Sequence, residues 1–456
     1  MSSKLTIVGL LAIATPAYGQ PAPPPPPTPA PADPAPGAAP DDPATPPLPA
    51  VPPAEAVATP PVAVAPVIEV PKHETKGKDE PPAKVTGAPG KGLTIKLGDA
   101  FSTNLRARIQ PRWQVHGAPD VMGDRKFDQL VTINTARVWL SGNAFNPRLT
   151  YMLQLALAGR DYRDGAISPI FDAFIDYKAT RELSVKAGQY FVPFDRLRTV
   201  RELALQLPER PRPVAELTLD RDVGVTLYSD HAFLGATSPL AWRVGVFGGG
   251  GTNLSTGKEP GVLLVARVEA RPLGEIDDDS EGDLARRRRP GLALGAGIAT
   301  NRNTNRQKST TGATFTGGTT DYVHLALDAT FKWRGFAAQL EYLRKTSSRA
   351  SIPSLADPAV LEWTRAGSGF VVQASYVLDP PVEFVGRFTR IYAPGGTDPK
   401  LISEIRNLGQ ELAGGVNYYL NNHQLKFQAA WIIRSPRDFD LDSSDHLVVA
   451  HLDATF

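Results

Sequence analysis

Residues 446–456 read HLVVAHLDATF, and their side chains alternate between apolar and polar. One face would carry Val448, Ala450, Leu452, Ala454 and Phe456, and the other His451, Asp453 and Thr455. Successive side chains of a β-strand point to opposite faces, so this stretch predicts a strand with one apolar face. Residues 411–420 and 424–433 repeat the pattern. A soluble sandwich also has such strands, so one segment alone does not decide the fold class.

About sixteen segments of this kind follow one another from residue 100 onwards. They are 104–115, 131–145, 148–159, 170–178, 182–190, 222–229, 241–248, 262–271, 291–300, 321–333, 335–345, 368–378, 382–391, 409–420, 423–434 and 446–456.

The joints between these segments largely alternate in length, which separates a barrel from a sandwich. Short joints include 146–147, 179–181, 379–381 and 421–422, whereas 116–130, 191–221, 301–320, 346–367, 392–408 and 435–445 are long. Outer-membrane barrels have tight turns on one side and long loops on the other. We therefore predict an all-β fold, a transmembrane antiparallel β-barrel of about sixteen strands over residues 96–456. The joint 272–290 is long where a short turn is due.

The first nineteen residues predict an export signal. Lys4 gives a positive start, Leu5–Ala14 are apolar, and Ala17 and Gly19 are small residues at the −3 and −1 positions. Such a pattern predicts a signal peptide over residues 1–19, with a mature chain that begins at Gln20. The apolar run is too short for a membrane-spanning helix, which needs about 20 residues.

A proline-rich segment follows, since residues 21–90 hold 24 of the 44 prolines. It has too few large apolar residues to offset the entropy of ordering, so we expect residues 20–95 to be a disordered periplasmic linker. Contact with the cell wall through this arm and a plain flexible tether both remain open.

Composition excludes several classes of function. A formal net charge of +2 gives no general attraction to nucleic acid. The absence of cysteine excludes thiolate metal sites and disulfides. Residues 251–258 have the wrong spacing for a phosphate loop, and Arg288 stands where a calcium loop needs a carboxylate. We expect no enzyme, no cofactor and no metal site.

Four motifs resemble the phosphate-selective porin O and P family. They are AGQYFVPFDR at 187–196, DRDVGV at 220–225, ARVWLSG at 136–142, and the hairpin 411–434. The resemblance covers about residues 100–456. It implies a sixteen-stranded, usually trimeric outer-membrane porin that passes small anions such as phosphate, with residues 191–221 as a third loop that narrows the pore. Members that select phosphate often carry consecutive arginines where this chain has Asn134 and Thr135.

Arginines supply the candidate site, because a guanidinium stays charged and offers a planar fork of donors to an oxyanion. The third loop would contribute Arg196, Arg198, Arg201, Arg210 and Arg212. The inward face of the wall would add Arg106, Arg108 and Arg137. We expect a passive channel for small hydrophilic solutes with an anion preference. The loop also contains acidic residues. A competing interpretation therefore remains, in which arginine–carboxylate pairs hold the loop to the wall and the loop adds no net electric field to the pore. A plugged barrel that serves as a structural or adhesive membrane anchor remains the alternative function.

Overall fold

The structure, a computed structural model, describes residues 83–120, 122–161, 168–232, 238–253, 261–379 and 381–456. The predicted signal peptide and most of the predicted linker lie outside these residues. Among the helices of the described residues, none is both long and apolar enough to cross a membrane.

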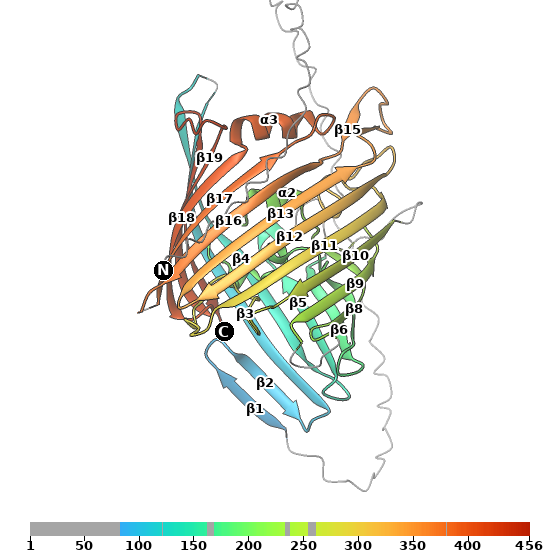
Figure 1. Ribbon diagram of the computed structural model, residues 1–456, viewed down its shortest axis with the longest axis vertical. Coiled ribbons are helices and arrows are strands. Elements are labelled where there is room, and N and C mark those ends of the chain that lie inside the picture. Colours follow the sequence, from blue (N-terminus) through green and yellow to red (C-terminus); the bar gives the residue numbers. More distant parts are fainter. Residues whose placement is uncertain (1–82, 121, 162–167, 233–237, 254–260, 380) are drawn as a thin grey trace, which may run out of the picture. The chain divides into compact units, whose positions relative to one another are not determined.

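Sixteen antiparallel strands form a closed barrel in which each strand pairs with the next in the chain (Figure 1). The barrel closes where β20 pairs with β3, with Thr455 opposite Arg108 and His446 opposite Gly117. The strands are β3 (Phe101–Pro119), β4 (Arg125–Asn143), β5 (Leu149–Ala156), β6 (Ile170–Lys178), β7 (Ser184–Phe191), β8 (Arg221–Ser229), β9 (Leu240–Phe247), β10 (Val262–Ala270), β11 (Gly291–Thr304), β12 (Thr320–Trp333), β13 (Phe336–Ser347), β16 (Gly367–Val377), β17 (Val382–Tyr392), β18 (Gln410–Asn421), β19 (Leu425–Ser435) and β20 (Asp445–Thr455). Each one overlaps one predicted segment, so the predicted fold class is confirmed.

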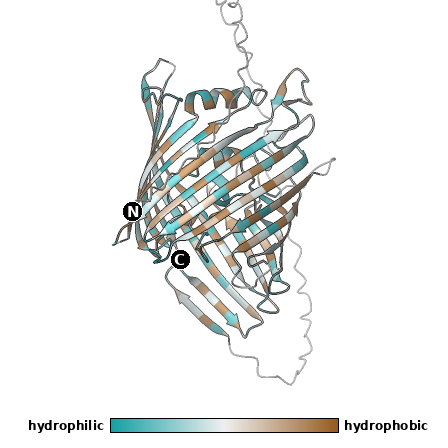
Figure 2. Cartoon of the chain, viewed as in Figure 1, coloured by the Kyte–Doolittle hydropathy of each residue, from teal (hydrophilic) through white to brown (hydrophobic). Residues whose placement is uncertain are grey.

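Hydrophobic and hydrophilic residues alternate along the strands, as the hydropathy colours show (Figure 2), and their exposure assigns them to the two sides of the wall. In β20, Leu452 is 39% exposed on the outside, whereas Asp453 is fully buried on the inside. Lipid favours apolar side chains outside the barrel, and polar side chains find partners inside it.

The joints lie at two rims, which we call the short-turn rim and the long-loop rim. One long joint was predicted wrongly, because β3 and β4 continue through most of 116–130, and only residues 120–124 lie between them. Residues 126–131 are exposed whichever way they point. Phe127, Val131 and Ile133 share one exposed face there, but the polar Gln129 interrupts it, so the alternation is weaker than in β20.

Two further strands, β1 (Lys84–Ala88) and β2 (Gly92–Leu97), precede the barrel as a hairpin. Strand β2 pairs with residues 101–105 of β3, on the edge that pairs with β20 farther along the strand. The predicted boundary between linker and barrel, at residues 95 and 96, falls inside this hairpin. The hairpin was missed because its alternating stretch is short and follows directly on the prolines.

The joints contain a few short elements. They are η1 (Gly159–Asp161), α1 (Arg196–Thr199), η3 (Glu202–Ala204), α2 (Arg212–Leu217), β14 (Ser351–Pro353), β15 (Leu361–Trp363) and α3 (Pro399–Leu408). Two joints enter the barrel. The inward loop, residues 192–220, comes from the long-loop rim between β7 and β8, and the inward turn, residues 271–290, comes from the short-turn rim between β10 and β11.

Candidate functional site

The inward loop is held against the wall by an apolar cluster. Its residues Phe194, Leu217 and Leu219 are buried completely. They pack with inward-facing apolar residues of six strands: Leu263, Val265, Ala299, Ala326, Leu343, Val371 and Ile391. Burial of this area removes apolar surface from water, which is the main force that fixes the loop to the β10–β17 side of the lumen.

Three buried wall lysines bind carbonyl groups of the inward segments. Lys345 donates to the Glu216 carbonyl at 2.6 Å, and Lys426 donates to the Leu205 carbonyl at 2.8 Å. Lys332 donates to the carbonyl oxygens of Asp277 and Ser280 at 2.6 and 2.8 Å. A buried ammonium is costly unless it is hydrogen-bonded, so these lysines fix the path of both segments.

The inward turn meets the inward loop inside the barrel. The Glu281 carboxylate accepts hydrogen bonds from the Gln206 backbone N–H at 2.8 Å and from the Gln373 side chain of β16 at 2.9 Å. The Glu281 backbone N–H donates to the Ala204 carbonyl at 3.3 Å. We call the inward loop and the inward turn together the partition. It fills the lumen beside the later strands.

A cavity of about 1160 Å³ remains between the partition and the earlier strands. Its lining includes Asp230 and Arg271, which follow β8 and β10 at the short-turn rim, and Leu130 and Leu447 nearer the long-loop rim. Because a water molecule occupies about 30 Å³ in the liquid, this space has room for many waters. The space for water and solutes in the described part of the barrel thus lies beside the partition.

Charged residues dominate the cavity lining. Fourteen lining residues are basic, thirteen of them arginines, and nine are acidic. Among the described residues, the lining therefore has five more basic than acidic side chains. The excess falls to one when Asp176, Asp328, Glu411 and Asp453 are counted, which pair with lining cations without lining the cavity themselves. In a confined space with low-dielectric walls, such an excess raises the local concentration of anions.

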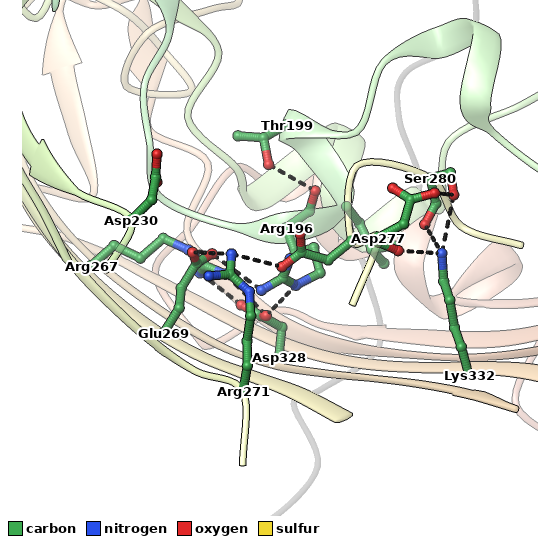
Figure 3. A network of polar contacts seen from close by, with 12 residues as sticks. Arg196, Thr199, Asp230, Arg267, Glu269, Arg271, Asp277, Ser280, Asp328 and Lys332 are labelled. Carbon is green, nitrogen blue, oxygen red and sulfur yellow. Dashed lines mark hydrogen bonds and ion pairs between the residues drawn. The ribbon is translucent and has the colours of Figure 1, made fainter. Parts of the chain in front are cut away.

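Arg196 lies in the cavity lining but is fully paired (Figure 3). Its guanidinium contacts Asp328 at 2.9 Å, Glu269 at 3.1 Å and Asp278 at 2.8 Å. Arg267 binds the same Asp328 and Glu269 from the wall. The geometry at Arg196 therefore fits the competing interpretation, in which arginine–carboxylate pairs hold the loop to the wall.

The other predicted loop arginines differ from one another. Arg198 pairs with Asp220, and the Arg210 guanidinium donates to the carbonyls of Leu197 and Val200. Arg201 is exposed to the cavity, and no acidic side chain among the described residues lies within ion-pairing distance of it. Arg201 and Arg210 thus bring positive charge to the lining without a carboxylate bound to either guanidinium.

Two predicted arginines lie outside the cavity. Arg212 donates to the Leu408 carbonyl and lies 3.6 Å from Glu404, so it joins α2 to α3. Arg106 donates to Asn104 and to the Lys91 carbonyl in the β1–β2 turn. Arg106 shares a face with Arg108, but it lies beyond the barrel seam, where that face meets the hairpin and not the lumen.

The two remaining predicted wall arginines do line the cavity and are paired. Arg108 forms a two-pronged contact with Asp453, at 2.7 and 2.5 Å, and lies 3.5 Å from Glu202 of the inward loop. Arg137 pairs with Asp161.

Aromatic rings hold three of the lining arginines in a stack. The Arg221 guanidinium carbon lies 3.6 Å from the ring centres of both Phe171 and Phe191. Arg137 lies 4.1 Å from the Phe171 ring, and Arg198 lies 5.3 Å from the Phe191 ring. Such cation–π contacts fix the planes of the guanidinium groups.

Several lining cations were not among the predicted site residues. They are Arg112, Arg160, Lys186, Arg221, Arg243, Arg267, Arg271 and Arg434. Arg112 and Arg267 lie in β3 and β10, where the alternation of side chains along the strand directs them inward. For Arg160 and Arg271, which lie in joints, the sequence carries no such signal.

Neighbouring arginines keep two acids of the inward loop ionised. Burial alone would raise the pKa of Glu202, but Arg160 and Arg108 lower it well below its ordinary value. Burial likewise opposes ionisation of Asp220, and Arg198 and Arg221 lower its pKa. These acids thus cancel part of the positive field, as expected from the composition of the loop.

Comparison with known proteins relates the chain to bacterial porins. A family model described as phosphate-selective porin O and P matches residues 105–453. Among solved structures, a Salmonella typhi OmpF complex with daunomycin has a TM-score of 0.50 and 15% identity, over 78% of this chain and 98% of that one. An anion-selective porin from Comamonas acidovorans has a TM-score of 0.44 and 13% identity, over 78% and 99%. At these identities the structural likeness concerns the fold alone. No curated protein sequence matches the chain.

Proposed function

The chain belongs to the phosphate-selective porin O and P family, and from this premise we propose that its barrel is a passive outer-membrane channel for small hydrophilic solutes that favours anions such as phosphate. The observation that carries the proposal is the cavity lining, in which fourteen basic residues face nine acidic ones. Because residues near both rims of the barrel line that cavity, solutes would cross the barrel beside the partition.

Within this proposal the arginines have two roles. Arg201 and Arg210, which have no bound carboxylate, would attract anions. The stacked Arg137, Arg198 and Arg221 would add less, because each is paired with a carboxylate, of Asp161, Asp220 and Asp172 respectively. Arg108 and Arg196 would mainly hold the inward loop in place, because their guanidinium groups are taken up by carboxylates.

The membrane arrangement is part of the proposal. Family and fold place the barrel in an outer membrane, where its outer face contacts lipid. We infer that residues 1–19 direct export, that the linker extends through the periplasm towards the cell wall, and that the channel is a homotrimer. Chemical cross-linking of the membrane-extracted protein, followed by intact mass measurement, tests both the trimer and a mature start at Gln20.

Bilayer recording tests the channel. The full-length protein, purified in detergent and reconstituted in a planar bilayer, is expected to give stable ohmic steps and a reversal potential on the anion side of a potassium chloride gradient. Electrical silence would favour the alternative of a plugged membrane anchor, and cation preference would refute the proposed selectivity.

A further inference from the structure

The hairpin β1–β2 has one apolar face. Register places Val85 opposite Ile95, and Leu97 opposite Phe101, so these side chains lie on the same side of the sheet. Leu93 lies on that side too, since it alternates with Ile95 and Leu97. Val85, Leu93 and Leu97 are 59, 44 and 45% exposed. We call this surface the hairpin apolar face.

The hairpin apolar face continues the lipid-facing surface of the barrel. Leu93 pairs with Leu105, Leu105 with Leu140, and Leu140 with Leu153, along one line across β2, β3, β4 and β5. Directly paired residues point to the same side of a sheet. Leu105, Leu140 and Leu153 are on the outside of the wall and are each about two-fifths exposed. The hairpin thus extends the outer apolar surface past the end of β20.

The opposite face of the hairpin is polar and internally bonded. Asn104 donates to the Thr94 hydroxyl at 2.7 Å and to the Lys91 carbonyl at 2.9 Å, and Arg106 donates to Asn104 at 2.8 Å. This face continues the lumen side of the wall, since Arg106 and Arg108 alternate with the outward Ala107. The two faces of the hairpin therefore keep the inside–outside character of the barrel wall.

The backbone limits how deep the hairpin can lie in the membrane. Among the described strands, β1 pairs only with β2, so its other edge has unpaired N–H and C=O groups. An open sheet edge does not occur in the hydrocarbon region, because no water is there to bind those groups. Conversely, the hairpin apolar face is unfavourable in bulk water. Both conditions are met at the boundary between headgroups and acyl chains.

Two features of the chain agree with that depth. The Phe456 carbonyl accepts a hydrogen bond from the Ala107 N–H, so the terminal aromatic ring marks the level just above the hairpin, and aromatic rings favour membrane interfaces. Lys91 is exposed in the turn between the two strands, whereas Lys84 and Lys96 lie on the polar face of the hairpin, where Lys96 pairs with Asp99. A lysine in the turn can reach anionic headgroups while the apolar face touches the acyl chains.

We propose that the hairpin β1–β2 is a membrane-contact element, whose apolar face lies against lipid at the headgroup boundary of the short-turn rim. It secures the point where the preceding chain joins the barrel. This inference does not depend on conduction through the lumen.

Spin labels on single introduced cysteines test this placement, because the chain has no cysteine of its own. Leu93→Cys and Leu97→Cys are labelled on the apolar face, and Thr94→Cys on the opposite face of the same strand. Leu452→Cys is the lipid-facing reference and Glu275→Cys the aqueous one. Each full-length variant is reconstituted in vesicles of phosphatidylcholine and phosphatidylglycerol, and heat-modifiable gel migration confirms that it is folded.

Collision with molecular oxygen, which concentrates in lipid, is compared with collision with a water-soluble nickel chelate. Labels at Leu93 and Leu97 are expected to favour oxygen, as at Leu452, whereas the label at Thr94 is expected to favour nickel. Nickel access at Leu93 equal to that at Thr94 would place the hairpin in water and overturn the proposal. Labels at Leu93 and Leu97 that neither reagent reaches, with line broadening between copies, would show instead that a second subunit covers this face.

Discussion

The backbone N–H of Gln206 lies 2.8 Å from the carboxylate of Glu281, although the two residues enter the barrel from opposite rims. This hydrogen bond is where the inward loop and the inward turn join into the partition. A sixteen-stranded barrel is too wide for its wall side chains alone to fill. The partition occupies one side of that space, so the charge of the remaining cavity is set jointly by partition residues such as Arg201 and Arg210 and by wall residues such as Arg137.

Removal of the Glu281 carboxylate is expected to loosen the partition. In Glu281→Ala the buried Gln206 N–H loses its acceptor, which costs about 1–3 kcal/mol. We expect a larger single-channel conductance with more frequent current fluctuations. Glu275→Ala is the matched control, because this acid belongs to the same turn but its side chain is 66% exposed. Identical conductance in both variants would mean that the two inward segments do not need this contact.

The arginines of the inward loop are expected to separate into two classes. Arg201→Gln removes a cation with no acidic partner among the described residues, so the reversal potential should move towards zero while heat-modifiable migration stays unchanged. An unchanged reversal potential in Arg201→Gln would show that this side chain adds nothing to selectivity.

Arg196→Gln should instead weaken the fold, because it leaves the buried Asp328 and Glu269 short of a partner. Loss of one member of a buried ion pair costs about 3–5 kcal/mol. The temperature at which the folded gel band disappears should fall. A normal unfolding temperature would contradict the anchoring role.

Glu202 is expected to keep its negative charge in moderate acid. Burial opposes its ionisation, but Arg160 and Arg108 lower its pKa below the ordinary value. A glutamate whose pKa is lowered by folding stabilises the folded protein at pH values above its ordinary pKa of about 4.3. That stabilisation is lost only as the pH falls through the lower folded-state pKa. Glu202→Gln should therefore strengthen anion preference by a similar amount at pH 7 and pH 4. A difference between variant and wild type that falls to about one third at pH 4 would indicate ordinary titration.

The alternation of apolar and polar side chains along each strand explains why the fold was predicted correctly. Lipid outside and polar partners inside impose a period of two on every strand, and β20 carries that period almost without fault. The inward turn had no comparable signal. Its run of acids and arginines reads as a solvated turn, and its partners Lys332 and Gln373 lie far along the chain.

The site was predicted only in part, because the alternation along a strand shows on which face of the wall a side chain lies but not how far along the barrel axis it lies. Arg106 and Arg108 share a face, yet one binds the β1–β2 turn and the other lines the cavity. The sequence also does not show which carboxylate each arginine pairs with. Arg196 meets Asp328 across 132 positions of sequence, so the count of acids in its own loop could not show that it is neutralised.

A methyl group at Gly297 is expected to push the inward loop away from the wall. A Cβ on this inward-facing residue of β11 would lie 2.2 Å from the Phe194 carbonyl oxygen, closer than any real contact. In Gly297→Ala the loop must therefore move towards the cavity, while strand pairing and heat-modifiable migration remain intact. We expect a lower single-channel conductance. Gly386→Ala on β17 is the control, since a Cβ there meets nothing within 4 Å, and it should conduct as the wild type does. If Gly297→Ala also conducts as the wild type does, the loop does not rest against β11 in the membrane, and the path of solutes is wider than the partition allows.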